Sequence, residues 1–594
     1  MRARMQTFRR LYLSVDPRTL GLLRCVMALV LLVDLGRRWP LIRVFYVNSG
    51  LLPNHRMLWH PVSKYSLSFL LSLSSAAEVQ VAFVGIACVY ISLLIGYRTR
   101  LCQILSWICF TALMVRVDVL TTGAECVLAE LVLWTAWLPL GTRFSVDAVL
   151  RSLREHPEQT VAELTTWQAR PREVRLVVSL AVLAAVTQLS VIYGLNALQK
   201  NGDTWHHGSA VYYLLHQERI VTMLGLWLRE HVPFGVLASL TYGTLVIEGA
   251  LPFVMLSPWG RPWTRRVAIL LIIALHLGIG LTANLGLFPV IMMTFALILI
   301  GPEDWDLLAA RVLPRAKLRW YVDASHSAAL HTARLCARLD PMRIVSFQPW
   351  SELPADLRRQ LPEASTWALT SLAGQRLLFP SWHRGTSSGY RKRIQRLLVE
   401  PLVRAVADRW QAFGHRRVIP TRRNWLTESL IGLLMLLATS NLLVHNYAIP
   451  EWLRVSQPRW AARACEYLRL DQGWSLFAPE APIDDMTVVI DAVTADGRHV
   501  DPLNALASRV ADPLTRTIPV RLGQSAQYCL YIAHALSDDA YHAPLRDWLL
   551  SYHRRTGRAA DRIVHFRAYR IEHMSPAPGE TAPHDVHASK FLSR

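Results

Sequence analysis

Apolar stretches that approach or reach the length of a membrane-spanning helix recur along this chain of 594 residues. A helix of about 20 apolar residues crosses the roughly 30 Å hydrocarbon layer of a bilayer. The stretches occur at 20–37, 78–96, 101–117, 124–140, 174–196, 235–256, 266–284, 286–301 and 425–445. They predict a polytopic integral membrane protein, an all-α helix bundle of about nine spans with two soluble portions attached.

Composition agrees with a membrane location and argues against nucleic-acid binding. The chain is 52% hydrophobic and only 18% charged. Aromatic rings such as those of Trp39, Trp134 and Trp259 stand beside hydrophobic runs, where they suit the membrane interface. The net charge of +21 comes from basic residues concentrated in alternate connecting segments. Membrane orientation selects that pattern, so we expect membrane lipid as a partner and no nucleic acid.

The basic residues also predict how the chain is oriented. Arg2, Arg4, Arg9 and Arg10 precede the first span, and the connections 98–100, 141–175, 257–266 and 302–424 are rich in arginine. Positive charge collects on the cytoplasmic side. We therefore expect a cytoplasmic N-terminus and an extracytoplasmic C-terminus, with Lys200 on the outer side.

The same pass along the chain predicts five regions. Alternating residues in MTVVIDAVTADGRHVDPL and RIVHFRAYRIEH indicate strands, and a helix is expected near 540–555, so the region after the last span reads as α+β. The expected regions are a transmembrane domain of about eight spans at 1–305, a basic cytoplasmic domain at 306–424, a ninth span at 425–445, a small α+β domain at 446–575 and a disordered tail at 576–594.

Ionisable residues within the spans are the candidates for function. Arg24, Glu248 and His276 are costly to bury, so each needs a partner, a water-filled cavity or a chemical role. We expect Arg24 to pair with a carboxylate, for which Glu248 is a candidate. A structural ion pair without chemistry is the alternative.

Lys200 stands at the end of the fifth span and allows two interpretations. It can extend to the interface as an anchor. It can also be partly desolvated, which lowers the pKa of the amine and lets it act as a base. Soluble-enzyme motifs are absent from the sequence, and the adjacent His206 and His207 lack metal-ligand spacing, so we expect no metal.

In these residues the chain resembles the HTTM family of membrane proteins, which includes vitamin K-dependent gamma-carboxylase. The pieces follow the family order through roughly the first 305 residues. They are LGLLRCVMALVLLVDL, FYVNSGLLP, PLGTRFSVDA, KNGDTWHHGSAVYY, Glu248 with Pro252, His276 followed by Phe288-Pro289, and PEDW. DQGWSLFAPEAP and the DGRHVD turn resemble the tail of other HTTM proteins.

The resemblance implies carboxylase-like lyase chemistry with a reduced, vitamin K-like quinone as cofactor. Lys200 precedes Trp205 by five residues, the interval between the base and a tryptophan in the carboxylase. The resemblance implies that this amine takes a hydroquinone proton, that oxygen then generates a strong base, and that the base removes a glutamyl γ-proton before carbon dioxide adds. Arg24, Trp205, Glu248 and His276 would form the pocket. A peptide or protein would be the substrate, and the inner membrane of a bacterium the location.

Two departures from the family patterns stand out. TTGAECVLAEL lacks the histidine that the carboxylase carries before its fourth span, although Glu125 is nearby. The segment from Leu318 to Trp350 is similar to a DCC-type, thioredoxin-like domain, but His326 and Ala329 occupy the places of its two cysteines. Dithiol exchange needs both sulfurs, so this resemblance implies a redox-inactive α/β insert. A helical domain that matches by coincidence is the alternative.

Two hypotheses for function follow. In the first, an HTTM membrane protein binds a quinone-like or lipid molecule among its helices and uses Lys200 as a base. In the second, the chain is a non-enzymatic membrane scaffold, maturation factor or transport accessory protein, and Lys200 is an interfacial anchor.

Overall fold

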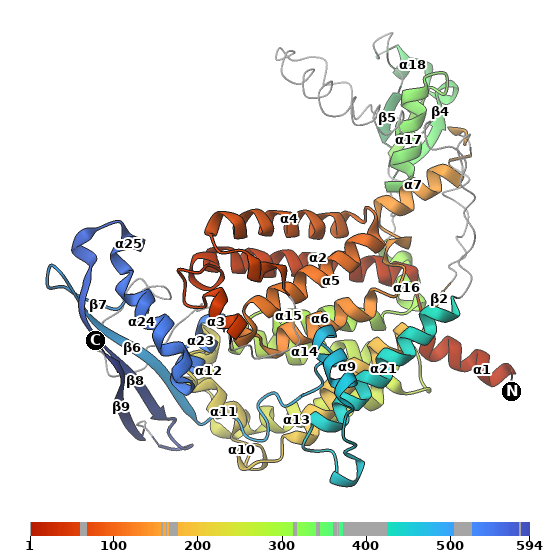
Figure 1. Cartoon of the computed structure of the whole chain (residues 1–594). Coiled ribbons are helices and arrows are strands. Elements are labelled where there is room, and N and C mark those ends of the chain that lie inside the picture. The colour runs from red at the N-terminus through yellow and green to blue at the C-terminus, as the bar shows by residue number, and fades with distance from the viewer. Residues whose placement is uncertain are drawn as a thin grey trace. The chain divides into compact units, whose positions relative to one another are not determined.

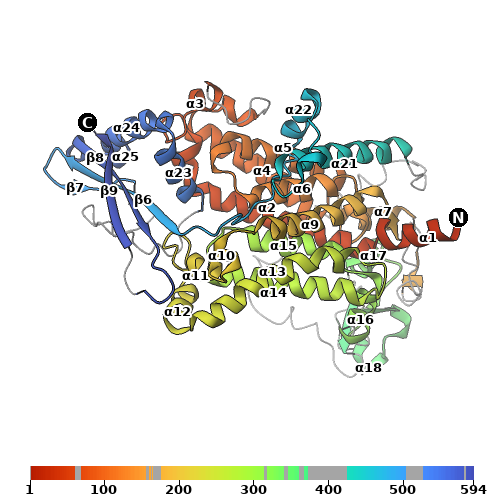
Figure 2. The same ribbon diagram turned by 90° about the horizontal axis from the view of Figure 1, so that it is seen from below.

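Figure 1 shows the computed structural model of the whole chain, and Figure 2 shows the same structure after a 90° turn. The structure describes residues 2–59, 68–155, 159–161, 163–164, 176–312, 318–339, 345–359, 361, 365, 367–371, 424–503, 526–580 and 584–593. The chain divides into two compact units. Unit 1 comprises Met1–Ser145, Arg175–Pro302 and Ser429–Arg594, and unit 2 comprises Val146–Val174 and Glu303–Glu428. The predicted transmembrane domain at 1–305 therefore contains two segments, 146–174 and 303–305, that belong to unit 2.

Six helices in the described residues are long and apolar enough to cross a membrane. They are α2 (Pro17–Arg38) with its continuation to Tyr46, α4 (Ala76–Ile95), α9 (Leu180–Gln199), α13 (Phe234–Leu256), α14 (Trp263–Thr282) and α21 (Trp425–His445). Each coincides with one of the nine predicted stretches. The chain thus has the predicted helical architecture with apolar helices of spanning length.

The other three predicted stretches also form helices. They are α5 (Thr99–Arg116), α6 (Gly123–Thr135) and α15 (Phe288–Ala296). The 13-residue α6 and the nine-residue α15 are shorter than a full crossing, and α5 ends at the buried Arg116. After α15 the chain bends by 97° into α16 (Pro302–Val312), and this bent pair is a further candidate for a broken span.

Local sequence signals define where these helices begin and end. Ser75 and Glu78 form a capping box at the start of α4, and Thr122 and Glu125 form another at the start of α6. α4 ends at Gly96, whose φ of 72° is left-handed and suits glycine.

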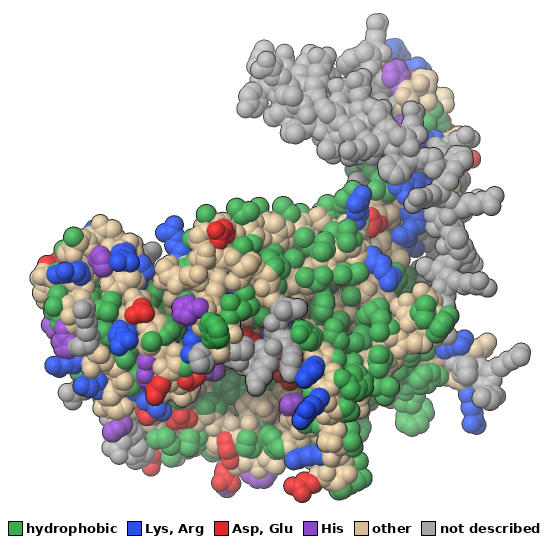
Figure 3. All heavy atoms as spheres, in the orientation of Figure 1, with side chains coloured by type: hydrophobic (Ala, Val, Ile, Leu, Met, Phe, Trp, Pro, Cys, Tyr) green, Lys and Arg blue, Asp and Glu red, His purple; other side chains and the backbone are tan. Residues whose placement is uncertain are grey.

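The outer faces of the spans are apolar, as lipid contact requires. Val81 on α4, Phe253 on α13 and Leu436 on α21 are each more than two-thirds exposed. Figure 3 shows hydrophobic side chains spread over the helical part, with charged and histidine side chains gathered on the C-terminal part at the left. An apolar surface of this extent is costly in water, which supports a membrane environment for these helices.

Within unit 1, α2 packs against α4, and α9 packs against α13. Short helices lie in the connections between spans: α3 (Asn54–Trp59), α10 (Asp203–His206), α11 (Ala210–Leu215) and α12 (Met223–His231). At the opposite end of α2, β1 (Ser14–Val15) pairs with β2 (Val177–Val178), and α1 (Arg2–Phe8) precedes them.

The C-terminal region is the predicted α+β structure. After α22 (Arg459–Leu468), an antiparallel sheet has the strand order β7-β6-β8-β9. Its strands are β6 (Asp484–Thr494), β7 (His499–Val500), β8 (Ile563–Met574) and β9 (His584–Ser593). The helices α23 (Ala526–Ser537), α24 (His542–Leu550) and α25 (Tyr552–Thr556) accompany the sheet.

The tail differs from the prediction. Residues His584–Ser593, expected to be disordered, form β9 and pair with β8. The long strand β8 offers a row of unpaired backbone groups on this side, and β9 satisfies them.

Unit 2 contains a three-stranded sheet with the order β4-β3-β5. β3 (Leu318–Val322) leads through α17 (Ser327–Leu339) to the parallel strand β4 (Val345–Pro349), and β5 (Trp367–Ser371) is antiparallel to β3. α7 (Val146–Glu155) and α18 (Ala355–Arg358) belong to the same unit. The insert is therefore α/β around a β-α-β crossover, and the coincidental helical alternative does not describe it.

Candidate functional site

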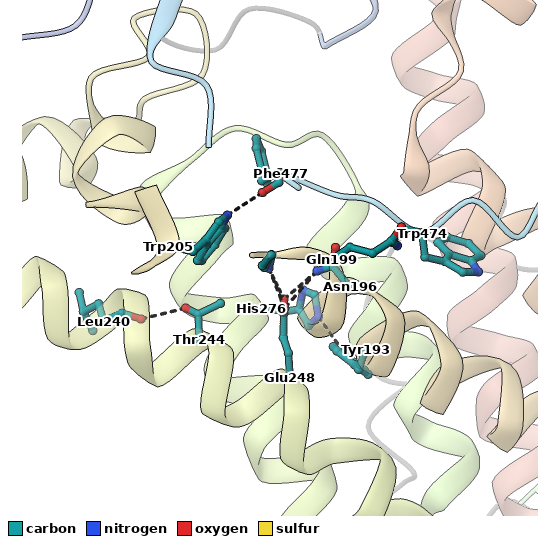
Figure 4. Close-up of polar contacts among 11 residues, drawn as sticks. Tyr193, Asn196, Gln199, Trp205, Leu240, Thr244, Glu248, His276, Trp474 and Phe477 are labelled. Carbon is teal, nitrogen blue, oxygen red and sulfur yellow. Dashed lines mark hydrogen bonds and ion pairs between the residues drawn. The ribbon is translucent and has the colours of Figure 1, made fainter. Parts of the chain in front are cut away.

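Lys200 is the residue that follows α9, and its ammonium is buried in an ion pair. Only 6% of Lys200 and 4% of Glu248 are exposed. The Lys200 Nζ donates to both carboxylate oxygens of Glu248, at 2.8 and 2.6 Å. Glu248, labelled in Figure 4, comes from α13, whereas Lys200 directly follows α9. The pair therefore joins these two packed helices. The cation is satisfied inside the protein and does not extend to the aqueous surface.

A second donor from α9 fixes the carboxylate. The Asn196 Nδ2 lies 3.0 and 3.1 Å from the two oxygens of Glu248. Asn196 and Lys200 are four residues apart, which places both side chains on one face of the chain as it leaves the helix. Glu248 therefore receives one charged and one neutral donor.

An aromatic ring covers the amine. The Lys200 Nζ lies 4.5 Å from the centroid of the Trp205 ring, a cation–π distance. Trp205 is on α10 and is itself buried, and its indole N–H donates to the carbonyl of Phe477 at 2.9 Å. Figure 4 shows Trp205 and Phe477 joined by this hydrogen bond. The five-residue spacing noted in the sequence thus corresponds to direct contact between lysine and tryptophan.

These surroundings affect the protonation of the amine. Burial lowers the pKa of Lys200, and the attraction of the Glu248 carboxylate opposes that shift. The lowered pKa makes the neutral amine more accessible than in an exposed lysine. A neutral amine can accept a proton from a donor within hydrogen-bond reach.

His276 lies on α14 near the same pair. Its Nε2 is 2.7 Å from the Tyr193 hydroxyl, whereas its buried Nδ1 has no hydrogen-bond partner among the described residues. His276 is close enough to Lys200 for their charges to interact. An unpartnered buried nitrogen is costly, so it marks a place where a ligand hydroxyl or a water would be stabilised.

Arg24 is held elsewhere, away from Glu248. Its guanidinium donates to the carbonyls of Leu93 and Leu94, at 2.7 and 2.8 Å, and to the carbonyl of Phe144. Leu93 and Leu94 belong to the last turn of α4, where carbonyls lack the N–H donor four residues on, although the Leu93 carbonyl also accepts from the Gly96 N–H at 3.1 Å. The expected pairing of Arg24 with Glu248 is therefore wrong, because Lys200 and Asn196 occupy the carboxylate and backbone carbonyls attract the arginine.

A second polar cluster surrounds Arg38. The Arg38 guanidinium donates to Asp34 at 2.7 Å, to Glu125 at 3.1 Å and to the Tyr46 hydroxyl at 3.1 Å. A cavity of about 40 Å³ lies beside it. Asp34, Arg38, Glu125 and Gln527 are among the residues that line it. It has room for water-sized molecules. Glu125, which stands near the position of the missing histidine, thus belongs to this cluster.

A segment from the C-terminal region completes the Lys200 site, and the sequence did not reveal its role. We call Trp474–Ala481 the docking segment. The Gln199 Nε2 donates to the Trp474 carbonyl, the Gly202 N–H donates to the Pro479 carbonyl at 3.1 Å, and Glu480 accepts from Thr204. The resemblance of DQGWSLFAPEAP to other HTTM tails was the available signal. Asn196 was also missed, although a polar residue four positions before Lys200 in an apolar helix is such a signal.

Comparisons of the chain with protein-family models, characterised proteins and solved structures find no match. Within the described residues, no group of three or more His, Cys, Asp or Glu side chains could hold a metal ion. The side chains at the site offer an amine, a carboxylate, an imidazole and aromatic rings.

Proposed function

We propose that this chain is an HTTM-type membrane protein in which Lys200 acts as a general base on a reduced, quinone-like molecule, in carboxylase-like chemistry. The observation that carries the proposal is the buried Lys200 amine, held between the Glu248 carboxylate and the Trp205 ring. A base has to be desolvated and kept within reach of a proton donor, and these contacts supply the first condition.

Residue usage supports a chemical role for this lysine. Of the 64 Lys and Arg residues in the chain, five are lysines: Lys64, Lys200, Lys317, Lys392 and Lys590. Arginine stays protonated in proteins, whereas a buried lysine can lose its proton. The chain uses arginine for almost every other cation, including the buried Arg24, Arg38 and Arg116. A lysine at position 200 can lose its proton and then act as a base, which an arginine there could not do.

Glu248 has a defined role in the proton transfer. When the neutral amine accepts a proton from a hydroxyl, the resulting ammonium forms the ion pair with the Glu248 carboxylate, which stabilises the product of the transfer. Asn196 keeps the carboxylate oriented toward the amine throughout.

Two features support a reduced quinone as the ligand. The buried Nδ1 of His276 has no hydrogen-bond partner among the described residues and could accept from a quinol hydroxyl, and Trp205 offers an aromatic ring beside Lys200. Such a group, together with oxygen, would supply a base strong enough to remove a glutamyl γ-proton so that carbon dioxide can add. The side chains of this protein would orient the group, exclude water and hold the first proton at Lys200 Nζ.

A carbon-fixation assay tests the proposal. Membranes containing the protein are given labelled bicarbonate, reduced menaquinone, oxygen and a glutamate-rich peptide. We expect label to enter the peptide only with reduced quinone, and Lys200→Arg to lower the rate at least about 100-fold, because arginine keeps the charge and cannot act as the base. The matched control is Lys590→Arg at an exposed position. Absence of quinone-dependent incorporation by the wild-type protein would overturn the proposal.

The alternative function is a non-enzymatic scaffold, maturation factor or transport accessory protein. The observation that favours it is the completeness of the Lys200–Glu248 pair, which would also serve as a structural link between α9 and α13. In that case Lys200→Arg leaves the cellular phenotype unchanged, since the charge pair is retained. A lost phenotype in a folded Lys200→Arg protein favours the base.

We propose further that nine segments cross the inner membrane of a bacterium, with the N-terminus inside and the C-terminus outside. The six long apolar helices support this topology, with α5, α6 and the bent α15–α16 pair as the additional crossings. Single cysteines at Asn201 and Ser387 should differ in labelling by an impermeant thiol reagent, with position 201 accessible from outside. Equal labelling at both positions would contradict this orientation.

We also propose that the insert is a thioredoxin-like domain of the DCC type without redox activity. The β3-α17-β4 crossover with parallel strands supports it. His326 directly precedes α17, and Ala329 lies in its first turn, where the family would carry its cysteines. Substituting both by cysteine should create a dithiol that oxidises reversibly; two thiols that never pair would count against this assignment.

A further inference from the structure

The helix that carries Trp205 has no capping side chain of its own. α10 consists of Asp203–His206, and its N-cap residue is Gly202, which has no side-chain acceptor for the first N–H groups. The carboxylate of Glu480, in the docking segment, takes that place. It accepts from the N–H of Asp203, from the N–H of Thr204 at 2.8 Å and from the Thr204 hydroxyl at 2.7 Å.

Gly202 makes this approach sterically possible. A Cβ at position 202 would lie 2.0 Å from one oxygen of Glu480 and 2.1 Å from its carboxyl carbon. A side chain at position 202 would therefore force the Glu480 carboxylate to shift from the place in which it caps α10. The glycine and the glutamate are therefore two halves of one contact, although they are separated by more than 270 residues in the sequence.

The docking segment makes further contacts with α10. The Ala481 N–H donates to the Thr204 hydroxyl at 2.9 Å, and the Phe477 carbonyl accepts from the Trp205 indole. Trp205, Ala210 and Ala481 also form a small buried hydrophobic cluster, against which Phe477 packs. These contacts fix both the backbone of α10 and the plane of the ring that covers Lys200.

We infer that Glu480 is a positioning residue that holds Trp205 over the Lys200 amine and keeps water from it, so that the C-terminal region is an integral part of the amine site. The inference rests on the proposed function for its chemical meaning, but the contact and its effect on the amine can be tested without any substrate. Glu480 touches neither the amine nor Glu248 in the contacts described above, and it acts through Trp205.

The small number of lysines allows a direct test. The full-length protein in detergent micelles is prepared with lysine labelled at Cε and Nζ, which gives five side-chain signals; the Lys200→Arg variant identifies the signal of Lys200. The protonation midpoint of Lys200 is then measured by titration in the wild-type protein, in Glu480→Gln and in Gly202→Ala. The matched control is Glu451→Gln, a change at an exposed glutamate on the neighbouring 3-10 helix Glu451–Leu453.

We expect the Lys200 midpoint to rise by on the order of one pH unit in Glu480→Gln and in Gly202→Ala, because water reaches the amine when α10 is released. Glu451→Gln should leave it unchanged. Thr204→Val removes the two hydroxyl contacts, with Glu480 and with the Ala481 N–H, and keeps the backbone N–H contacts with Glu480. It should give a smaller rise, which provides a readout even where a larger change prevents folding. An unchanged midpoint in folded Glu480→Gln and Thr204→Val would overturn the inference.

The outcome separates this inference from the proposed function. The Lys200 midpoint could rise in the variants although the wild-type protein fixes no carbon. That result would contradict the carboxylase-like proposal and support the positioning role of Glu480. Quinone-dependent carbon fixation that is identical in wild type and Glu480→Gln, with an unchanged midpoint, removes the positioning role and leaves the proposed function.

Discussion

Two buried cations in unit 1, Arg24 and Lys200, are stabilised in different ways. Arg24 donates to three backbone carbonyls, of Leu93, Leu94 and Phe144. Lys200 faces a carboxylate and an aromatic ring. Arginine stays protonated in proteins, whereas a buried lysine can lose its proton, and the Glu248 carboxylate can stabilise the ammonium when the proton returns. Arg24 therefore suits a permanent charge that joins helices, and Lys200 suits a charge that changes with protonation.

Burial alone therefore does not reveal which ionisable residue in a span has a chemical role and which is structural. Both residues are almost completely buried. The kind of cation and the contacts described above distinguish them, and such contacts are determined by tertiary structure. The following predictions test whether Lys200 and Arg24 really differ in this way.

The largest expected effect comes from removing the Lys200 charge. Lys200→Met leaves the Glu248 carboxylate buried without its cation, which should cost about 4 kcal/mol of unfolding free energy. The double variant Lys200→Met/Glu248→Gln should recover most of that loss, because no uncompensated charge remains. Equilibrium unfolding in mixed micelles measures both, and a single variant as stable as the double one would show that the pair carries no charge coupling.

Arg24→Lys should lose about 3 kcal/mol, since one ammonium cannot reach the carbonyls that the guanidinium bridges. The reciprocal change Lys200→Arg should cost less, because the bidentate pairing with Glu248 suits a guanidinium. The same unfolding measurement applies to both variants. If Arg24→Lys and Lys200→Arg lost the same unfolding free energy, the proposed difference between a structural Arg24 and a chemical Lys200 would be contradicted.

Low pH should destabilise α10, the helix whose Trp205 lies over the Lys200 amine, and should not affect the contacts of Arg24. Although burial of Glu480 acts to raise its pKa, hydrogen bonds from the Thr204 hydroxyl and backbone N–H groups lower the pKa below its ordinary value. A carboxylate with a depressed pKa contributes stability above the unfolded pKa, near 4.5, and loses it as pH falls through the folded pKa. Backbone hydrogen exchange at Asp203 and Thr204, corrected for intrinsic rates, should therefore accelerate below about pH 4.5.

In Glu480→Gln that acid-induced acceleration should be absent, because glutamine does not titrate. The amides at the end of α4 beside Arg24 provide the internal reference and should show no such step. Equal acid dependence in wild type and Glu480→Gln would assign the effect to another group.

The smallest expected effect concerns His276. Tyr193→Phe removes one neutral hydrogen bond to Nε2 and should cost about 1 kcal/mol, while the Lys200–Glu248 pair remains. Unfolding free energy and the Lys200 titration midpoint measure the two parts separately. A large shift of the midpoint would mean that Tyr193 belongs to the amine site itself.

Hydropathy was sufficient to predict the helical architecture, because lipid contact requires long apolar helices whatever their neighbours. It located the six helices of spanning length, as well as the shorter α5, α6 and α15. Period-2 alternation located β6 and β8 in the C-terminal region. It failed for β9, because a strand at a sheet edge depends on the partner that it pairs with as much as on its own sequence.

The candidate site was predictable only in part. Lys200, Glu248 and His276 stand out as ionisable residues in apolar surroundings, and the lysine–tryptophan spacing pointed to Trp205. Which cation pairs with Glu248 could not be predicted, since Arg24 and Lys200 were both available in the sequence. Glu480 could not be predicted either, because its contact with α10 has no local periodicity and depends on a glycine far away in the chain.

The most direct test of this account is the protonation midpoint of the Lys200 amine in the wild-type protein, measured by titration of its labelled side-chain signal. The exposed Lys590 in the same sample is the reference. We expect a midpoint for Lys200 clearly below that of Lys590, because burial lowers the pKa of the Lys200 amine. A Lys200 midpoint equal to or above that of Lys590 would contradict this account.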